Sequence, residues 1–150
     1  MNVVHIKKEN GYTLAEVLIV LTIFFLVITL TMVSFKPLVR QLQINYFFKQ
    51  LQLDISYSQI YAISHFKDVN IIFYPESHRY EIIPGFNGSR LVNRSYSKGI
   101  KIELVTLPAN VTFLANGTIR KAGKMYVHFY DDKYTFVFLF GKGQTYVEKW

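Results

Sequence analysis

The sequence predicts an α+β fold in which a long N-terminal helix packs on a small, antiparallel, β-rich head. Three observations support this prediction. Residues 17–35 carry no charge, apolar residues then recur at helical spacing as far as Phe66, and short β-rich runs separated by turn residues occupy positions 67–150. The 150 residues are enough for one domain with an appendage.

The first half of the predicted helix is apolar enough to span a membrane. A membrane-spanning helix needs about 20 mostly apolar residues, and Leu14–Phe35 supplies them with a single charge, Glu16. A cleaved secretory signal is disfavoured, because the run is too long and Phe35-Lys36-Pro37 offers no small-residue cleavage site. A simple signal anchor fits the length but does not explain Glu16, since a carboxylate in an apolar helix is costly and usually functional.

Helical periodicity continues over residues 36–66, the amphipathic half of the predicted helix. Apolar residues three, four or seven positions apart form one stripe: Ile44, Phe48, Leu51, Ile55, Ala62 and Phe66. Polar residues such as Lys49 and Asp54 fall largely outside this stripe, which predicts that the stripe packs against the head. Pro37 should bend the helix or interrupt it locally.

The head is predicted to contain seven short strands. They are Val69–Tyr74, Tyr80–Ile83, Lys98–Leu104, Val111–Leu114, Met125–Tyr130, Tyr134–Phe140 and Gln144–Val147. The turn residues Asp131-Asp132-Lys133 predict a hairpin between the fifth and sixth strands. The polar segment Phe86–Ser97 predicts a loop.

The sequence shows no pattern typical of an enzyme. The chain has no cysteine, so disulfides and thiolate metal sites are excluded. Its four histidines are scattered without the spacing of a metal site, and neither a phosphate-binding loop nor a nucleophile elbow is present. We therefore expect no cofactor, no metal and no catalytic residue. The net charge of +7 favours contact with anionic polymers or membrane surfaces.

A short motif precedes the apolar helix. Behind Lys7-Lys8 stands Gly11-Tyr12-Thr13-Leu14-Ala15-Glu16, which closely resembles the type IV prepilin signature. The resemblance implies that residues 1–11 are a leader, and that a prepilin peptidase cuts between Gly11 and Tyr12 and methylates the new amino terminus. It also implies that Glu16, with Thr13 and Leu14, serves assembly by facing the amino terminus of a neighbouring subunit. An ammonium group there would offset the cost of a carboxylate in lipid.

Glycine-paced segments in the head carry a second resemblance. They are Phe113-Leu114-Ala115-Asn116-Gly117-Thr118, Gly123 and Gly141-Lys142-Gly143-Gln144. These segments are similar to the heads of the minor pseudopilins, the class that includes GspH and FimT, and most similar to the pseudopilins of Gram-positive competence systems. The resemblance implies a pilin-like fold and a subunit of a pseudopilus that takes up DNA.

The same resemblance implies the domain organisation, the localisation and the partners of the chain. Residues 1–11 would be the leader, 12–35 the membrane and assembly half of the helix, 36–66 its amphipathic half, and 67–150 the head. The protein would cross the cytoplasmic membrane once, with its head outside, and would reach the cell surface on assembly. Its implied partners are the prepilin peptidase, other pseudopilins, an assembly ATPase and a membrane platform protein.

Two alternatives remain open. A minor pseudopilin of a type II secretion system, or a minor pilin of a type IV pilus, would carry the same features. A membrane-anchored binding module or enzyme could carry the motif by coincidence. That last alternative predicts an uncut Met1 terminus and indifference to the substitution Glu16→Ala.

Direct DNA contact is a further hypothesis from the sequence. Cationic residues interleaved with aromatic ones can follow a phosphate backbone and stack on bases. The candidates are Arg90, Arg94, Lys98 and Lys101. A solvated basic face, or contact with an anionic wall polymer, is the competing interpretation.

Overall fold

The computed structural model describes residues 12–85, 88–141 and 144–150, and for residues 31–36 it describes the backbone alone. By its internal contacts the chain divides into two units, Met1–Gln41 and Leu42–Trp150. Helix α1, Leu14–His65, begins in the first unit and ends in the second. Its backbone stays helical through Pro37, so the interruption considered at this proline does not occur. One missing backbone donor is a local loss that the neighbouring turns can tolerate.

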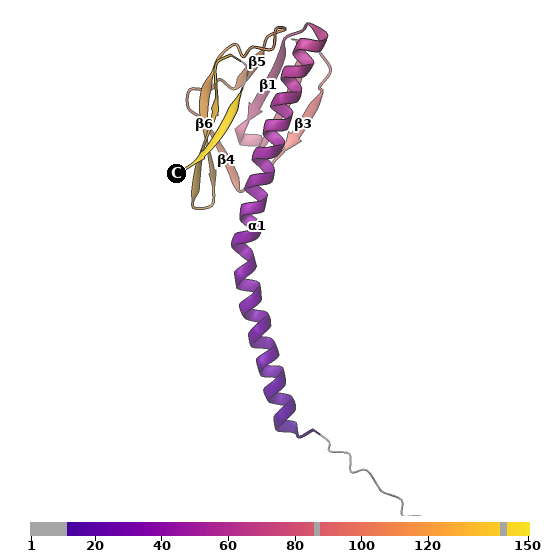
Figure 1. The fold of residues 1–150 in the computed structure, drawn as a ribbon, viewed down its shortest axis with the longest axis vertical. Coiled ribbons are helices and arrows are strands. Elements are labelled where there is room, and N and C mark those ends of the chain that lie inside the picture. Colours follow the sequence, from indigo (N-terminus) through magenta and orange to yellow (C-terminus); the bar gives the residue numbers. More distant parts are fainter. Residues whose placement is uncertain (1–11, 86–87, 142–143) are drawn as a thin grey trace, which may run out of the picture. The chain divides into compact units, whose positions relative to one another are not determined.

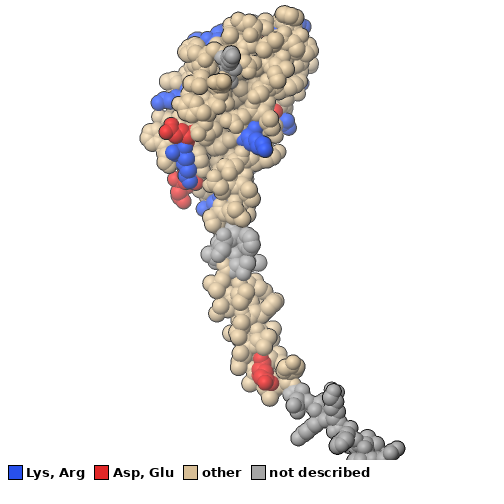
Figure 2. Space-filling model, viewed as in Figure 1, with Lys and Arg blue, Asp and Glu red and all other residues tan. Residues whose placement is uncertain are grey.

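In the first unit, the described side chains of α1 face solvent. All of those from Tyr12 to Leu30 are exposed, although most are apolar. Figure 2 shows a red patch on this otherwise tan stretch, where Glu16 is the only charged residue between positions 12 and 30. Among the described residues, no helix has both the length and the hydropathy needed for a membrane crossing.

In the described part of the second unit, α1 is followed by eight strands and a short 3-10 turn (Figure 1). The strands are β1 (Val69–Tyr74), β2 (Arg79–Pro84), β3 (Val92–Ser95), β4 (Ile100–Leu104), β5 (Asn110–Phe113), β6 (Gly123–Phe129), β7 (Asp132–Phe138) and β8 (Thr145–Lys149). They form two four-stranded antiparallel sheets. Sheet A has the order β3-β2-β1-β5, and sheet B has the order β4-β6-β7-β8.

The core of the second unit lies between the helix and both sheets. Five of the six stripe positions on α1 are buried, namely Ile44, Phe48, Leu51, Ile55 and Ala62. The ring of Phe48 contacts Tyr134 and Phe136 of sheet B, with ring centroids 5.2 and 6.1 Å apart. In β6 the buried residues Met125, Val127 and Phe129 alternate with half-buried ones, as expected for a strand with one face on the core. The predicted packing of the stripe against the head is therefore confirmed.

The seven predicted strands all exist, with bounds shifted by at most a few residues, and β6 and β7 form the predicted hairpin. The prediction of a loop over Phe86–Ser97 is wrong in part, because β3 lies within it; Phe86 falls outside the described residues. Strand β3 pairs with β2 through its backbone, and three of its four side chains are exposed. It is an edge strand without the apolar alternation that marks a half-buried strand.

Two residues of the predicted helix differ from their predicted environments. Phe66 is 84% exposed, because the helix ends at His65 and the left-handed backbone of Phe66 (φ 50°) turns the chain away. Asp54, expected outside the packed stripe, is only 5% exposed. Polar partners from sheet A make that burial possible.

Candidate functional site

Three hydrogen bonds between Thr13 and Glu16 cap the start of α1. The backbone N–H and the hydroxyl of Thr13 donate to Glu16 Oε2 at 2.8 and 3.0 Å. The backbone N–H of Glu16 donates in return to Thr13 Oγ1 at 3.3 Å. This arrangement is a capping box, which satisfies backbone donors that the first turn of a helix leaves unpaired. Glu16 therefore has an intramolecular role in addition to the intermolecular one expected from the sequence.

Tyr12, expected at the cleavage and methylation site, and Leu14, expected to serve assembly, are both exposed. Tyr12 is 87% and Leu14 is 78% exposed, so both are open to contact by another molecule. Gly11, the residue expected before the cut, lies outside the described residues. The helix dipole at this end favours a negative charge, which suits the position of Glu16 in the first turn.

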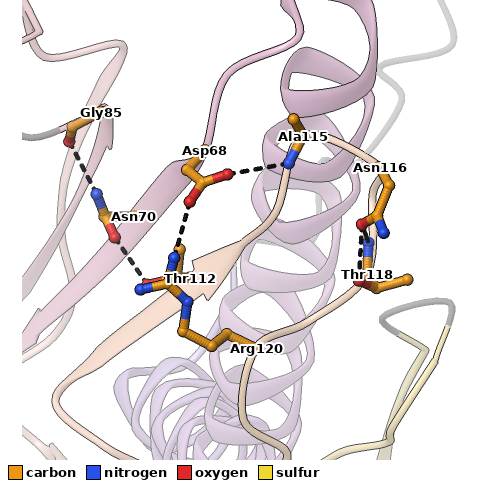
Figure 3. A network of polar contacts seen from close by, with 8 residues as sticks. All are labelled: Asp68, Asn70, Gly85, Thr112, Ala115, Asn116, Thr118 and Arg120. Carbon is orange, nitrogen blue, oxygen red and sulfur yellow. Dashed lines mark hydrogen bonds and ion pairs between the residues drawn. The ribbon is translucent and has the colours of Figure 1, made fainter.

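The segment that resembles minor pseudopilin heads is a turn held by polar contacts (Figure 3). Asp68 accepts hydrogen bonds from the backbone N–H of Ala115 at 3.0 Å and from Arg120 Nη2 at 2.8 Å. Asn116 Oδ1 accepts from both the backbone N–H and the hydroxyl of Thr118. At the centre of the turn, Gly117 has φ +79°, and a Cβ there would lie 2.5 Å from Ile63 Cδ1 of α1. The positive φ favours glycine at this position, whereas the half-exposed Ile63 side chain could move aside for a Cβ.

A buried carboxylate connects α1 to sheet A. Asp54 Oδ2 accepts hydrogen bonds from the Tyr80 hydroxyl at 2.7 Å and from Arg94 Nε at 3.0 Å. Gln50 donates to the other carboxylate oxygen at 3.1 Å. Tyr80 and Arg94 also line a pocket of about 540 Å³ beside α1. A buried acid is stable only with such partners, and the sequence alone did not indicate that Asp54 had them.

The four cations expected to contact DNA do not act as one group. Arg94 is paired with Asp54, and Arg90 Nη1 lies 3.3 Å from Glu81 Oε1. Lys98 lies between β3 and β4, and Lys101 lies on β4 in the other sheet. Figure 2 shows the basic residues of the visible face as separate blue patches. Among the described residues, no three His, Cys, Asp or Glu side chains come together as a metal site would require.

Tyr80 and Tyr96, which both line the pocket beside α1, predict a loss of stability at alkaline pH. Burial raises the pKa of Tyr96 to about 12, and burial with the hydrogen bond to Asp54 raises the pKa of Tyr80. An unfolded tyrosine ionises near pH 10. Above that pH the unfolded chain therefore binds fewer protons than the folded one, so the free energy of unfolding falls as pH rises.

Replacing each tyrosine by phenylalanine should affect the stability of the fold differently. The Tyr96 hydroxyl is buried without a hydrogen-bond partner among the described residues, so Tyr96→Phe should leave stability at pH 7 unchanged or higher and reduce the alkaline loss. Tyr80→Phe removes a donor from buried Asp54 and should cost about 1 kcal/mol at pH 7. Urea unfolding of the detergent-solubilised chain at pH 7, 9 and 11 would measure both. Equal destabilisation by the two variants at pH 7 would contradict this assignment.

Comparison with known proteins gives consistent results. Residues 6–32 match the family described as the prokaryotic N-terminal methylation motif. Over 146 residues, which are 97% of this chain and 98% of the relative, the chain is 27% identical to the competence protein ComGD of Bacillus subtilis strain 168.

The fold is that of minor pilins and pseudopilins. The minor pseudopilin EpsH from the type 2 secretion system of Vibrio cholerae has a TM-score of 0.57 at 10% identity, over 71% of this chain and 97% of that one. The type IV minor pilin FimU of Pseudomonas aeruginosa PAO1 has a TM-score of 0.55 at 16% identity, over 67% and 84% of the two chains. The predicted α+β, pilin-like fold is therefore confirmed.

Proposed function

This chain is a type IV pilin-like protein related to ComGD, and from that premise we propose that it is a minor pseudopilin of a DNA-uptake pseudopilus. The observation that carries the proposal is the relation to a competence protein along nearly the whole length of both chains. The methylation motif at residues 6–32 supports the same function, because it marks the end by which such subunits are processed and assembled.

In this proposal the chain is processed at its amino terminus before it assembles. A prepilin peptidase would cut between Gly11 and Tyr12, which would place a new ammonium group on Tyr12 and make Glu16 the fifth residue of the processed chain. The exposed first half of α1 would be anchored in the cytoplasmic membrane and would then pack among the helices of other pseudopilins. The head would lie outside that membrane and would be carried to the cell surface.

The work of the subunit would be structural. An assembly ATPase and a membrane platform protein would supply the energy and the base for assembly, and the chain itself would catalyse no reaction. The Thr13–Glu16 contact supports a part of this proposal, since it holds the carboxylate at the very end of the helix. There the carboxylate can meet the amino terminus of a neighbour.

A second candidate is a minor pseudopilin of type II secretion or a minor pilin of a type IV pilus. The similarity of the fold to EpsH and FimU supports this candidate. Those two proteins share only 10% and 16% identity with the chain, so the fold is what they have in common with it.

Uptake of labelled DNA by an in-frame deletion strain tests the proposal. We expect the deletion to abolish uptake and the wild-type chain to restore it. Normal uptake by the deletion strain under competence-inducing conditions would overturn the assignment to DNA uptake. Loss of secretion or of piliation in that strain would then support the second candidate.

A further inference from the structure

Strand β8, the yellow strand that ends at the C label in Figure 1, is an edge of sheet B, and among the described strands it pairs with β7 alone. Its hydrogen bonds show which of its residues face β7. The Leu139 N–H donates to the Gln144 carbonyl at 2.9 Å, and at the other end of the pair the Trp150 N–H donates to the Lys133 carbonyl at 2.9 Å. Because such bonds recur at every second residue of an antiparallel pair, the even-numbered residues of β8 turn their backbone groups to β7.

The odd-numbered residues of β8, which are Thr145, Val147 and Lys149, turn their backbone groups outward. Within the part of the chain that the structure describes, no group hydrogen-bonds to the N–H or the carbonyl of these three residues. Native proteins commonly block such an edge with a proline, a bulge or a charged side chain. Strand β8 has no proline and pairs without a bulge, and its Lys149 is drawn to Asp132 of β7, Nζ to Oδ1 at 2.8 Å. The edge is therefore open to another strand.

A groove of about 520 Å³ lies between this edge and α1. Gln52, Ser56 and Gln59 line it from α1, and residues of the β7–β8 hairpin line it from the sheet. Ser56 Oγ donates to the Gln52 carbonyl at 2.9 Å, and Gln59 Nε2 donates to the Gly117 carbonyl at 2.8 Å. The hydroxyl of Ser56 and the side-chain carbonyl of Gln52 can still accept hydrogen bonds. The groove thus offers polar groups of α1 on one side and an open strand on the other.

The side chains of β8 add an apolar surface to this edge. Val147 is opposite Phe136, which is fully buried, so the Val147 side chain lies on the core face of the sheet. It packs against the core, yet it is only half-buried. A further strand would place a side chain directly beside Val147 and complete its burial. The edge is therefore incomplete in its packing as well as in its hydrogen bonds.

We propose that β8 accepts an extended segment of a neighbouring pilin-like subunit, which lies in the groove beside α1 and adds a fifth strand to sheet B. The proposal deepens the proposed function and rests on it. The five residues of β8 span roughly 17 Å, so a segment of about five residues fills the edge. Backbone hydrogen bonds would supply the affinity and alternate side chains the selectivity, with an apolar residue of the segment beside Val147.

The spacing of the open groups selects a polypeptide backbone as the ligand. Outward N–H and carbonyl groups at every second residue match a chain with the same repeat, and neither a polyanion nor a folded surface of side chains has it. The place of the groove selects the source of that chain. The groove borders α1, the helix through which subunits pack in the proposed assembly, so a neighbour held on α1 is within reach of it.

The β8 strand of a second copy does not suit this edge. Two identical edges that pair across a twofold axis are antiparallel. Such a pair would reverse the part of α1 beside the head in one copy relative to the other. In the proposed function, however, every α1 enters the same membrane in the same direction. The occupant is therefore a different segment, supplied by another pilin-like subunit.

Proline substitution tests the orientation of the edge. Val147→Pro removes an N–H that the fold does not use, and edge strands tolerate proline at such positions. The variant should melt within a few degrees of Val147→Ala, the matched control that keeps the N–H, and Thr145→Pro is a second variant of the same kind. Tyr146→Pro removes an N–H that faces β7 and should lower the melting temperature by roughly 5 °C or more. Equal melting temperatures for Val147→Pro and Tyr146→Pro would contradict the orientation.

Photo-cross-linking in competent cells tests the strand addition itself. A photoreactive phenylalanine analogue in place of Tyr146, whose side chain is 45% exposed beside the edge, should cross-link to a second pilin-like subunit. Mass spectrometry of the product should locate the link in one segment of that subunit. Val147→Pro should lower the yield about tenfold or more, because it removes a hydrogen bond and its ring meets the incoming backbone, whereas Val147→Ala should retain the yield.

The outcomes separate this proposal from the proposed function. Equal yields in the proline and alanine variants would overturn the proposal, as would a cross-link to a second copy of this chain or no cross-link to any pilin-like subunit. Any of these results with abolished uptake in the deletion strain would leave the proposed function standing and this edge excluded. Normal uptake in the deletion strain would instead overturn the assignment to DNA uptake, whatever β8 binds.

Discussion

Replacement of Glu16 by alanine should lower DNA uptake by roughly 100-fold or more while the chain is still cut after Gly11. The reason is that an assembled helix places this carboxylate in apolar surroundings, where it needs a cationic partner. The new amino terminus of a neighbouring subunit is that partner in the proposed assembly. Uptake of labelled DNA and the mass of the chain recovered from membranes measure the two parts of this prediction.

Two further variants separate the roles of Glu16. Glutamine at this position can still accept the hydrogen bonds of the capping box but carries no charge, so Glu16→Gln should fail in uptake as the alanine variant does. Thr13→Ala removes the other half of the capping box and should cost about 1 kcal/mol of helix stability, with uptake largely kept. Full uptake in the Glu16→Gln strain would show that the charge is not used, and accumulation of uncut chain would place Glu16 in processing instead.

The order of helix and strands could be predicted because the spacing of apolar residues differs between the two. A period of 3.6 in the helix and a period of 2 in the strands reflect which side chains are buried, and residues such as Ile55 and Val127 lie in the core as their spacing predicts. Turn residues such as Asp131 gave the hairpin, because few other residue types favour turns. The motif at Gly11–Glu16 gave the expected assembly site for a different reason, namely its resemblance to a known signature.

Features that depend on distant partners could not be predicted from spacing. Strand β3 exists because β2 offers backbone hydrogen bonds to a polar segment, and nothing within residues 92–95 indicates that. The burial of Asp54 depends on Tyr80 and Arg94, which lie 26 and 40 positions away in sequence. The sequence placed Arg94 among possible DNA contacts because a sequence gives the charge of a residue but not its partner in the fold, which is Asp54.

The same limit applies to the charged and aromatic side chains that sheet B brings together. Lys124, Lys133 and Trp150 are scattered along the last 27 residues, and only the register of sheet B brings them together. Of the four cations expected from the sequence, Lys101 alone lies on the outer face of that sheet. A cluster that the fold assembles is invisible to a search for neighbouring residues in the sequence.

Gly123→Ala should be among the most damaging single substitutions in the head. Gly123 begins β6, and a Cβ at this position would lie 2.7 Å from the backbone nitrogen of Leu107 and 2.8 Å from its Cα. Backbone atoms cannot move aside as a flexible side chain can. The backbone N–H groups of Thr106 and Leu107 both donate to the Lys124 carbonyl, at 3.1 and 3.2 Å, so a shift would also strain these contacts.

The cost should be about 2–3 kcal/mol, as for overpacking of a well-filled core, and would lower the melting temperature of a domain of this size by roughly 10 °C. Leu107 is 4% exposed, so its displacement would also disturb the core. Thermal unfolding of the detergent-solubilised chain, followed by Trp150 fluorescence, measures the effect. Gly99→Ala is the matched control, because there the nearest atom to an added Cβ is the edge of the Phe129 ring at 3.3 Å. A melting temperature for Gly123→Ala equal to that of Gly99→Ala would mean that the chain at 105–107 can move off β6 without cost, and that its contacts do not hold sheet B together.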